Sequence, residues 1–233
     1  MIFKVNLLMP IAWKLCGNIR MDFLIWLLLI RPMGPQTLIL LGGGRDMEPI
    51  WSEIRPVQNI ERTGGGSWKK YGKKIVAWDT APGEDYFTEL FRVSRNQIIW
   101  GGNYFQLPPT RCFIVWKKLT ISENFTMAMA EYAWTSFWDN AKVCEFAPQG
   151  NKETRFHPTQ KPVELYKWVI DRYAQPGDII LDTHAGSASS LIACHLTGHK
   201  FLGCEIDIEY YSKAKRRLDD AMAQTTIFDF IGG

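Results

Sequence analysis

The sequence feature that most constrains the fold is a short apolar run that ends in an acid and continues into a turn of small residues. Ile179–Leu181 has the composition of a buried strand, Asp182 closes it, and Gly186 precedes an apolar segment of helical length at 187–196. Small residues let a bulky ligand approach the backbone at the carboxyl edge of a sheet. The pattern therefore predicts a strand, a ligand-binding turn and a helix.

A second acid follows at a spacing that suits a nucleoside ligand. Glu205 closes the strand predicted at 201–205, twenty-three residues after Asp182. An acid at the tip of a neighbouring strand can accept both hydroxyls of a ribose, and Asp182 can receive the ammonium of an amino-acid-like ligand. The alternative is an ordinary strand, turn and helix with a capping acid. The spacing of the two acids favours the ligand-binding interpretation.

A loop bracketed by prolines lies just upstream, at His157–Pro162. Pro162 suits the first turn of a helix, and Thr159 and Lys161 can hold the carboxylate end of a ligand. The alternative is an ordinary helix N-terminus flanked by prolines, with no ligand. We interpret His184 as a turn residue, because a lone histidine without acidic partners indicates no metal site.

Strands and helices alternate along the chain from about residue 57 onward, whereas the sequence before it shows little periodicity and no convincing alternation. The predicted helices are 85–93, 163–173, 187–196 and 210–223, and the predicted strands are 97–100, 112–116, 131–136, 179–181 and 201–205. A polar segment without a predicted element runs from the third of these strands to Phe156. The alternation predicts an α/β fold with a mixed, mostly parallel sheet and helices on both faces.

Composition narrows the class of protein further. The chain has 233 residues, 46% hydrophobic and 22% charged, which fits one α/β domain with a large core. Its net charge of +3 permits a polyanionic partner without requiring one. The five cysteines lack CxxC spacing, so we expect reduced thiols, a cytoplasmic protein and no metal. The apolar stretch Phe23–Ile30 is shorter than the roughly 20 residues that a membrane-spanning helix needs.

Three motifs together resemble the β-group of S-adenosylmethionine-dependent DNA amino-methyltransferases. They are HPTQKP at 157–162, LDTHAGSAS at 181–189 and GCEID at 203–207, and the resemblance covers about residues 57–218. It implies a Rossmann-like methyltransferase fold with S-adenosylmethionine as the cofactor. The residues it implies around the cofactor are His157, Thr159, Gln160, Lys161, Pro162, Asp182, Thr183, Ala185, Gly186, Ser187 and Glu205.

The turn departs from the DPFxGSGT-like pattern of that family at several positions, of which three change the chemistry most. They are Thr183, His184 and Ala188. The phenylalanine that commonly flanks the adenine ring of the cofactor is replaced by His184, which implies a reshaped adenine contact.

The catalytic loop of the resembled family, Asp-Pro-Pro-Tyr, is absent from the chain. In that family the loop accepts the protons of an exocyclic amine and stacks a tyrosine on a base swung out of the duplex. Residues 79–82 read Asp-Thr-Ala-Pro, without the aromatic, so we predict that they lead into a helix and do not act in catalysis. The catalytic residues are therefore unknown.

The missing loop can be recovered in another reading frame. Residues 23–35, back-translated with synonymous codons and reread from each third base, give Phe-Asp-Leu-Ala-Ile-Val-Asp-Pro-Pro-Tyr-Gly-Pro. Trp26 and Met33 have one codon each and still fit. We hypothesise that residues 1–56 are a frame-shifted part of the same domain, and that 57–233 are its methyltransferase domain. The alternative is a divergent N-terminus that folds in its own way.

Double-stranded DNA is the partner that the resemblance implies. Candidates for phosphate contacts are Lys69, Lys70, Lys73 and Lys74, together with Lys117 and Lys118 at the end of a predicted strand, although ordinary solvated charges explain them equally well. Residues 119–156 are the expected target-recognition insert.

We therefore expect transfer of a methyl group to N6 of adenine in DNA, with inactivity of this chain if the frame shift holds. Residues 96–103 look most like phage and prophage members, and a role in restriction-modification is expected. The adenine preference depends on the reread Asp, since a Ser there would indicate N4 of cytosine. The alternatives are a non-catalytic remnant that binds cofactor or DNA, an N4-cytosine DNA methyltransferase, and a methyltransferase acting on RNA or protein.

Overall fold

A seven-stranded sheet is the framework of the protein. The computed structural model describes residues 23–27, 82–125, 127–148, 155–205 and 207–231. Within them the strands lie in the order β5-β3-β4-β2-β1-β6-β7. Their bounds are β1 Phe23–Leu27, β2 Ser94–Trp100, β3 Phe113–Lys118, β4 Ala130–Thr135, β5 Lys142–Phe146, β6 Ile179–Asp182 and β7 Lys200–Gly203.

The sheet is mixed and mostly parallel, as predicted. Among the described strands, β4 runs antiparallel to both of its neighbours, β2 and β3, and the other pairs are parallel. The carboxyl ends of β1, β2, β3, β5, β6 and β7 therefore meet at one edge of the sheet, together with the start of β4. We call this the carboxyl edge, and it is where an open α/β sheet binds its ligands.

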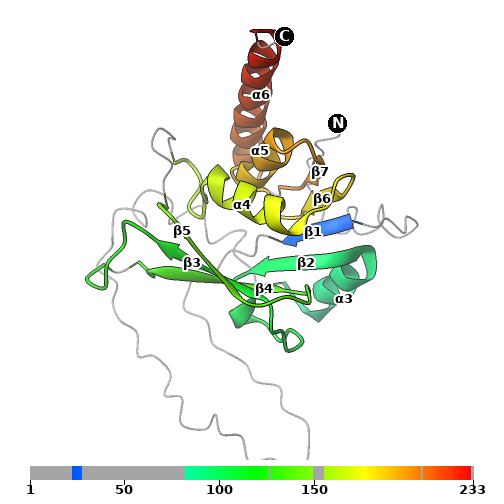
Figure 1. Cartoon of the computed structure of the whole chain (residues 1–233), viewed down its shortest axis with the longest axis vertical. Helices are drawn as coiled ribbons and strands as arrows, with labels where there is room; N and C mark the ends of the chain where they lie inside the picture. The colour runs from blue at the N-terminus through cyan, green and yellow to red at the C-terminus, as the bar shows by residue number, and fades with distance from the viewer. Residues whose placement is uncertain (1–22, 28–81, 126, 149–154, 206, 232–233) are drawn as a thin grey trace, which may run out of the picture. The chain divides into compact units, whose positions relative to one another are not determined.

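Helices cover both faces of the sheet (Figure 1). The helix α3, Glu84–Val93, packs on the face that carries Ile99 and Leu181. The helices α4, Val163–Tyr173, and α5, Ser189–Leu196, pack with α6, Ile208–Ile231, on the face that carries Ile98, Trp100 and Ile180. Successive residues of a strand point to opposite faces, so one apolar run contributes side chains to the core on each face of the sheet. A strand buried on both faces reads as a continuous apolar run, as β6 does at Ile179–Leu181 and as β2 does only in its last three residues, Ile98–Trp100.

Strand β1 lies in the middle of the sheet, in the apolar stretch 23–30 of a segment whose sequence shows no convincing alternation. It pairs in parallel with β2 and with β6, and its register matches Trp26 with Asp182. An apolar stretch without alternation suits a strand between two helical layers, which is why periodicity did not reveal it. The rest of the segment in the frame-shift hypothesis, residues 1–22 and 28–56, lies outside the described residues.

Strand β5 was also missed, because it falls in the polar segment 137–156. It is an edge strand whose side chains face solvent alternately, with Val143 66% exposed. The predicted target-recognition insert, 119–156, thus contains two strands of the main sheet, β4 and β5.

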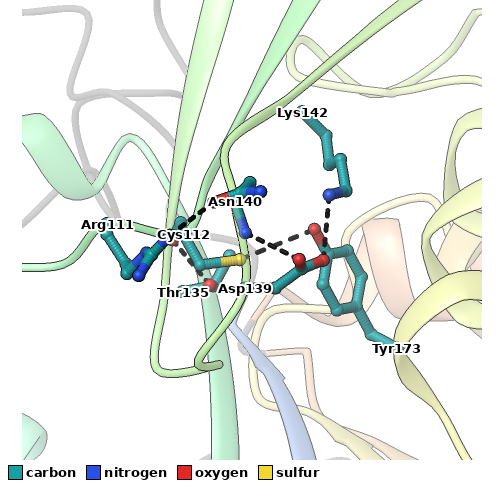
Figure 2. A network of polar contacts seen from close by, with 7 residues as sticks. All are labelled: Arg111, Cys112, Thr135, Asp139, Asn140, Lys142 and Tyr173. Atoms are coloured by element: carbon teal, nitrogen blue, oxygen red, sulfur yellow. Dashed lines mark hydrogen bonds and ion pairs between the residues drawn. The ribbon is translucent and has the colours of Figure 1, made fainter.

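A polar network ties the opposite edge of the sheet together (Figure 2). Its members are Arg111, Cys112, Thr135, Asp139, Asn140, Lys142 and Tyr173. Arg111 donates to the Oδ1 of Asn140 at 2.6 Å, and Lys142 pairs with Asp139 at 3.0 Å. These bonds hold the β4–β5 connection against the sheet, far from the carboxyl edge.

Candidate functional site

The turn after β6 is built around a fully buried carboxylate. Asp182 is 0% exposed, and its Oδ1 accepts a hydrogen bond from the backbone N–H of His184 at 2.9 Å. Its Oδ2 accepts one from the hydroxyl of Ser190 on α5. Burial raises the pKa of Asp182 to about 6, against the lowering effect of these two hydrogen bonds. A carboxylate oxygen has two acceptor sites, so each oxygen retains acceptor capacity.

The second predicted acid joins the same turn. The backbone N–H of Gly186 donates to Oε2 of Glu205 at 2.9 Å, and that of Asp207 donates to Oε1 at 2.9 Å. Two backbone bonds, from Ala185 to the carbonyl of Cys204 and from Cys204 to the carbonyl of Asp182, each 2.8 Å, hold the turn to the end of β7. The sequence prediction that the two acids follow neighbouring strands is confirmed.

The loop 157–162 packs directly on this turn. A Cβ built on Gly186, which has φ +52, would lie 3.2 Å from Cε1 of His157. Glycine is therefore required there both by the backbone and by the ring. Burial, together with the charges of Arg155 and Lys161, lowers the pKa of His157 to about 3. The neutral ring lies 4.4 Å from the ring of Tyr210, so His157 is a packing group in this structure.

The remaining residues of the loop are engaged within the protein. Thr159 Oγ1 lies 2.9 Å from Nδ1 of His157, and Oε1 of Gln160 accepts from the N–H of Phe156 at 3.3 Å. Pro162 caps α4 with φ −66. Lys161 is buried, and its Nζ lies 2.8 Å from Oε2 of Glu131. The expected contact of Thr159 and Lys161 with a ligand carboxylate stays a prediction.

The start of α5 follows the turn with a strained residue. Ala188, the N-cap of α5, has φ +60 and ψ +21, the left-handed region that residues with a Cβ avoid. Ser187 is buried, and its carbonyl accepts from Arg217 of α6 at 2.7 Å. Ala185 is buried as well.

The structure adds one residue that the sequence did not single out. The hydroxyl of Tyr86 on α3 lies 2.7 Å from Oγ1 of Thr183, which lies 3.0 Å from Nδ1 of His184. The rings of Tyr86 and His184 meet edge to face, with centroids 5.8 Å apart. Burial lowers the pKa of His184 to about 4, so its ring is neutral and serves as an aromatic surface. No sequence signal links Tyr86 to a turn almost a hundred residues away.

Several predicted features cannot be located. The lysines at 69–74 and the Asp-Thr-Ala segment at 79–81 lie outside the described residues. Of the other two candidate phosphate contacts, Lys117 is exposed and pairs with Glu145 at 2.8 Å. The side chain of Lys118 is buried against Glu131, so the predicted phosphate contact of Lys118 is wrong in this structure. Within the described part of the chain, no group of three or more histidine, cysteine, aspartate or glutamate side chains could hold a metal ion. In the same part, no helix has the length and apolarity to cross a bilayer.

The sequence comparison decides the family. Residues 48–216, more than half of the chain, match the family described as DNA methylase. The chain belongs to that family. The β-group resemblance seen in the three motifs is thereby confirmed at the level of the family.

Curated relatives match shorter stretches of this DNA methylase. The DNA adenine methyltransferase YhdJ of Escherichia coli (strain K12) is 48% identical over 65 residues, which are 28% of this chain and 22% of the relative. The type II methyltransferase M.HpaI of Haemophilus parainfluenzae is 41% identical over 69 residues, 30% of this chain and 22% of the relative. The type II methyltransferase M2.MboI of Moraxella bovis is 27% identical over 144 residues, 61% of this chain and 48% of the relative. The matches thus span less than half the length of each relative.

The fold is shared with a solved methyltransferase. The crystal structure of the M1.HpyAVI–SAM complex superposes with a TM-score of 0.54 and 17% identity, covering 93% of this chain and 99% of that one. At that identity the likeness shows the fold alone, and it confirms the predicted Rossmann-like architecture.

Proposed function

We propose that this DNA methylase is built to transfer a methyl group from S-adenosylmethionine to N6 of adenine in double-stranded DNA, and that the polypeptide as translated binds the cofactor without transferring the methyl group. The observation that carries the proposal is the 2.9 Å hydrogen bond from the Gly186 amide to Glu205. It joins the turn after β6 to the acid that follows β7, which is the arrangement that a nucleoside cofactor needs.

The two acids have the chemistry to recognise the two ends of the cofactor. Each oxygen of Glu205 accepts one backbone N–H and retains a lone pair for a ribose hydroxyl. Asp182 offers a negative charge for the ammonium of the methionine portion. Tyr166 Oη and Trp100 Nε1 are buried without a hydrogen-bond partner among the described residues, which fits a site that receives a polar ligand.

The other predicted residues have supporting roles in this proposal. Gly186 gives the cofactor access to the backbone, and the neutral rings of His184 and Tyr86 offer the adenine a flanking surface. The residues that we propose around the cofactor are His157, Thr159, Gln160, Lys161, Pro162, Asp182, Thr183, Ala185, Gly186, Ser187 and Glu205.

The position of β1 supports the frame-shift part of the proposal. Trp26 is level with Asp182 in the β1–β6 ladder, so a loop that follows β1 begins beside the cofactor turn. Back-translated with synonymous codons, the same stretch can be reread in the shifted frame as an apolar strand followed by Asp-Pro-Pro-Tyr. In the translated frame, residues 28–35 read Leu-Leu-Ile-Arg-Pro-Met-Gly-Pro and supply no carboxylate. Without that carboxylate, the amine of the target base has no group to accept its protons.

The proposal also covers the biological role, the origin and the localisation of the protein. Names of the relatives, a DNA adenine methyltransferase and type II methyltransferases, support a DNA substrate and a restriction-modification role. We propose a cytoplasmic protein of bacterial or phage origin. The transfer of a methyl group from a sulfonium requires no metal.

The test compares two purified chains, one translated as given and one from a gene in which the frame of residues 1–56 is corrected. Each is titrated with S-adenosylmethionine by calorimetry and incubated with labelled cofactor and unmethylated duplex DNA. We expect binding by both chains and label incorporation only by the corrected one. Incorporation by the uncorrected chain at the same rate would refute the frame-shift proposal.

The product identifies the target base. Nucleosides from the labelled DNA, separated by mass spectrometry, are expected to contain N6-methyladenine. N4-methylcytosine would overturn the adenine assignment, and label found only in RNA or protein would overturn the DNA substrate. Reading the gene is a further check, because a nucleotide sequence without Asp-Pro-Pro-Tyr in any frame contradicts the hypothesis.

A further inference from the structure

Two buried lysines and a partly exposed glutamate, whose side chain is 32% exposed, form an ion cluster at the carboxyl edge. Oε1 of Glu131 lies 2.7 Å from Nζ of Lys118, and its Oε2 lies 2.8 Å from Nζ of Lys161. The side chains of Lys118 and Lys161 are 6% and 5% exposed. Lys118 ends β3, Glu131 lies near the start of β4, and Lys161 belongs to the loop 157–162. The cluster therefore joins the antiparallel part of the sheet to that loop.

Aromatic rings complete the surroundings of the two ammonium groups. Nζ of Lys161 lies 5.5 Å from the ring centroid of Trp100, and Nζ of Lys118 lies 5.3 Å from that of Trp116. Although burial raises it, the charges of Lys161 and Lys118 lower the pKa of Glu131 to about 2. Glu131 is thus ionised at neutral pH. Buried ammonium groups on ring faces depend strongly on a charged partner, because little water reaches them.

We propose that Glu131 is a positioning residue for the cofactor: it holds Lys161, and through Lys161 it sets the loop 157–162 against the turn at Gly186. This inference rests on the proposed cofactor site and deepens it. Glu131 itself does not touch the cofactor.

The loop is short and closed, so an anchor at one end fixes its other end. Lys161 is bound to Glu131, and the next residue, Pro162, has a fixed φ and begins α4. At the other end the His157 ring lies against Gly186, and the N–H of Gln160 donates to the carbonyl of His157 at 3.2 Å. Release of Lys161 therefore loosens the contact between His157 and the cofactor turn.

The chain provides a matched control within the same cluster. Lys118 binds the other oxygen of Glu131, and its ammonium has no part in the loop. Lys118→Met leaves the Glu131–Lys161 pair intact and removes the surplus positive charge of the cluster. The substitution therefore removes one ion pair of Glu131 but leaves the loop 157–162 bound to Glu131 through Lys161.

The experiment is a double-mutant cycle on the full chain with Glu131→Gln, Lys161→Met and both together. The dissociation constant for S-adenosylmethionine is measured by calorimetry and the thermal midpoint by calorimetric melting. We expect Glu131→Gln to raise the dissociation constant about tenfold in the original chain, and less than about twofold when Lys161 is already methionine. Lys118→Met is expected to change it less than about twofold.

Hydrogen exchange of the Thr159 and Gln160 amides gives a second measurement that needs no cofactor. We expect about tenfold faster exchange in Glu131→Gln and no change in Lys118→Met. Equal losses of affinity from Glu131→Gln in both backgrounds, or unchanged exchange at these amides, would overturn the inference and leave Glu131 a general stabiliser. A folded original chain that does not bind S-adenosylmethionine refutes the proposed cofactor site instead, and hydrogen exchange still decides the role of Glu131.

Discussion

At the scale of single residues, the turn after β6 carries an alanine in a backbone conformation that favours glycine. Ala188 has φ +60 and is fully buried. The left-handed region costs an L-residue about 1–2 kcal/mol, and loss of a buried methyl group costs about 0.8 kcal/mol. We therefore expect Ala188→Gly to raise the free energy of unfolding by about 0.5 kcal/mol. Urea unfolding measures the change, and a loss of stability would contradict the strain.

The raised pKa of Asp182 predicts a pH dependence of cofactor binding. In the folded protein burial raises this pKa to about 6, so the side chain takes up a proton as the pH falls below that value. A ligand ammonium favours the ionised form, and its binding therefore weakens as the pH falls. We expect the affinity for S-adenosylmethionine to rise about tenfold between pH ~5 and pH ~7 and then to level off.

Asp182→Asn is the control for this pH dependence. The amide keeps an acceptor for the N–H of His184 but has no charge, so the variant is expected to bind weakly with little change between the two pH values. If the affinity of Asp182→Asn for S-adenosylmethionine changed with pH as much as that of the original chain, the pH dependence would belong to another group. His184 and His157 are poor alternatives, because burial lowers their pKa values to about 4 and about 3.

The residues that the sequence predicted best are those whose role follows from local spacing. Asp182, Gly186 and Glu205 sit at strand ends and in a turn, where the chain order alone brings them to one edge. Glu131 and Tyr86 were not predicted, because their contacts with Lys161 and Thr183 join segments distant in sequence. Lys161 was predicted as a ligand contact, and its ion pair with Glu131 could be found only in the folded structure.

At the scale of elements, α5 is the support on which the turn rests. Leu191 is fully buried, and it packs so closely on β7 that a Cβ on Gly203 would lie 2.4 Å from its Cδ1. We expect Leu191→Ala to lower the free energy of unfolding by about 3 kcal/mol, since it leaves a cavity between helix and strand. Leu196→Ala, in the same helix but 45% exposed, is expected to cost less than about 0.5 kcal/mol. Equal losses in urea unfolding would contradict this packing.

The sequence predicted the elements that have one polar face or that are bounded by proline or glycine. The helix 163–173 was predicted with its observed bounds, because Pro162 precedes it and Pro176–Gly177 follows. The helix predicted from Ser187 begins at Ser189, since Ser187 and Ala188 belong to the turn. Strand β5 escaped prediction because an edge strand with charged residues resembles a loop, and periodicity does not reveal β1 because its five residues are all apolar.

At the scale of the whole molecule, the sheet order separates the proposed cofactor site from the proposed place of the catalytic loop along the chain. The turn, both acids and the loop 157–162 come from the part of the chain after residue 156, and they contact one another. The catalytic loop of the family is expected after β1, whose register brings its end beside Asp182. The proposed change of frame, confined to residues 1–56, therefore removes the catalytic loop and leaves the residues of the proposed cofactor site unchanged.

The measurement that tests the central claim most directly is a calorimetric titration of the folded chain with S-adenosylmethionine, alongside Glu205→Gln. The amide keeps the size of the side chain and removes the charge that accepts the Gly186 N–H and that we propose to bind the ribose hydroxyls. We predict saturable binding by the original chain and an affinity at least about tenfold lower in the variant. A folded original chain that shows no binding, or a variant that binds equally well, would contradict the account.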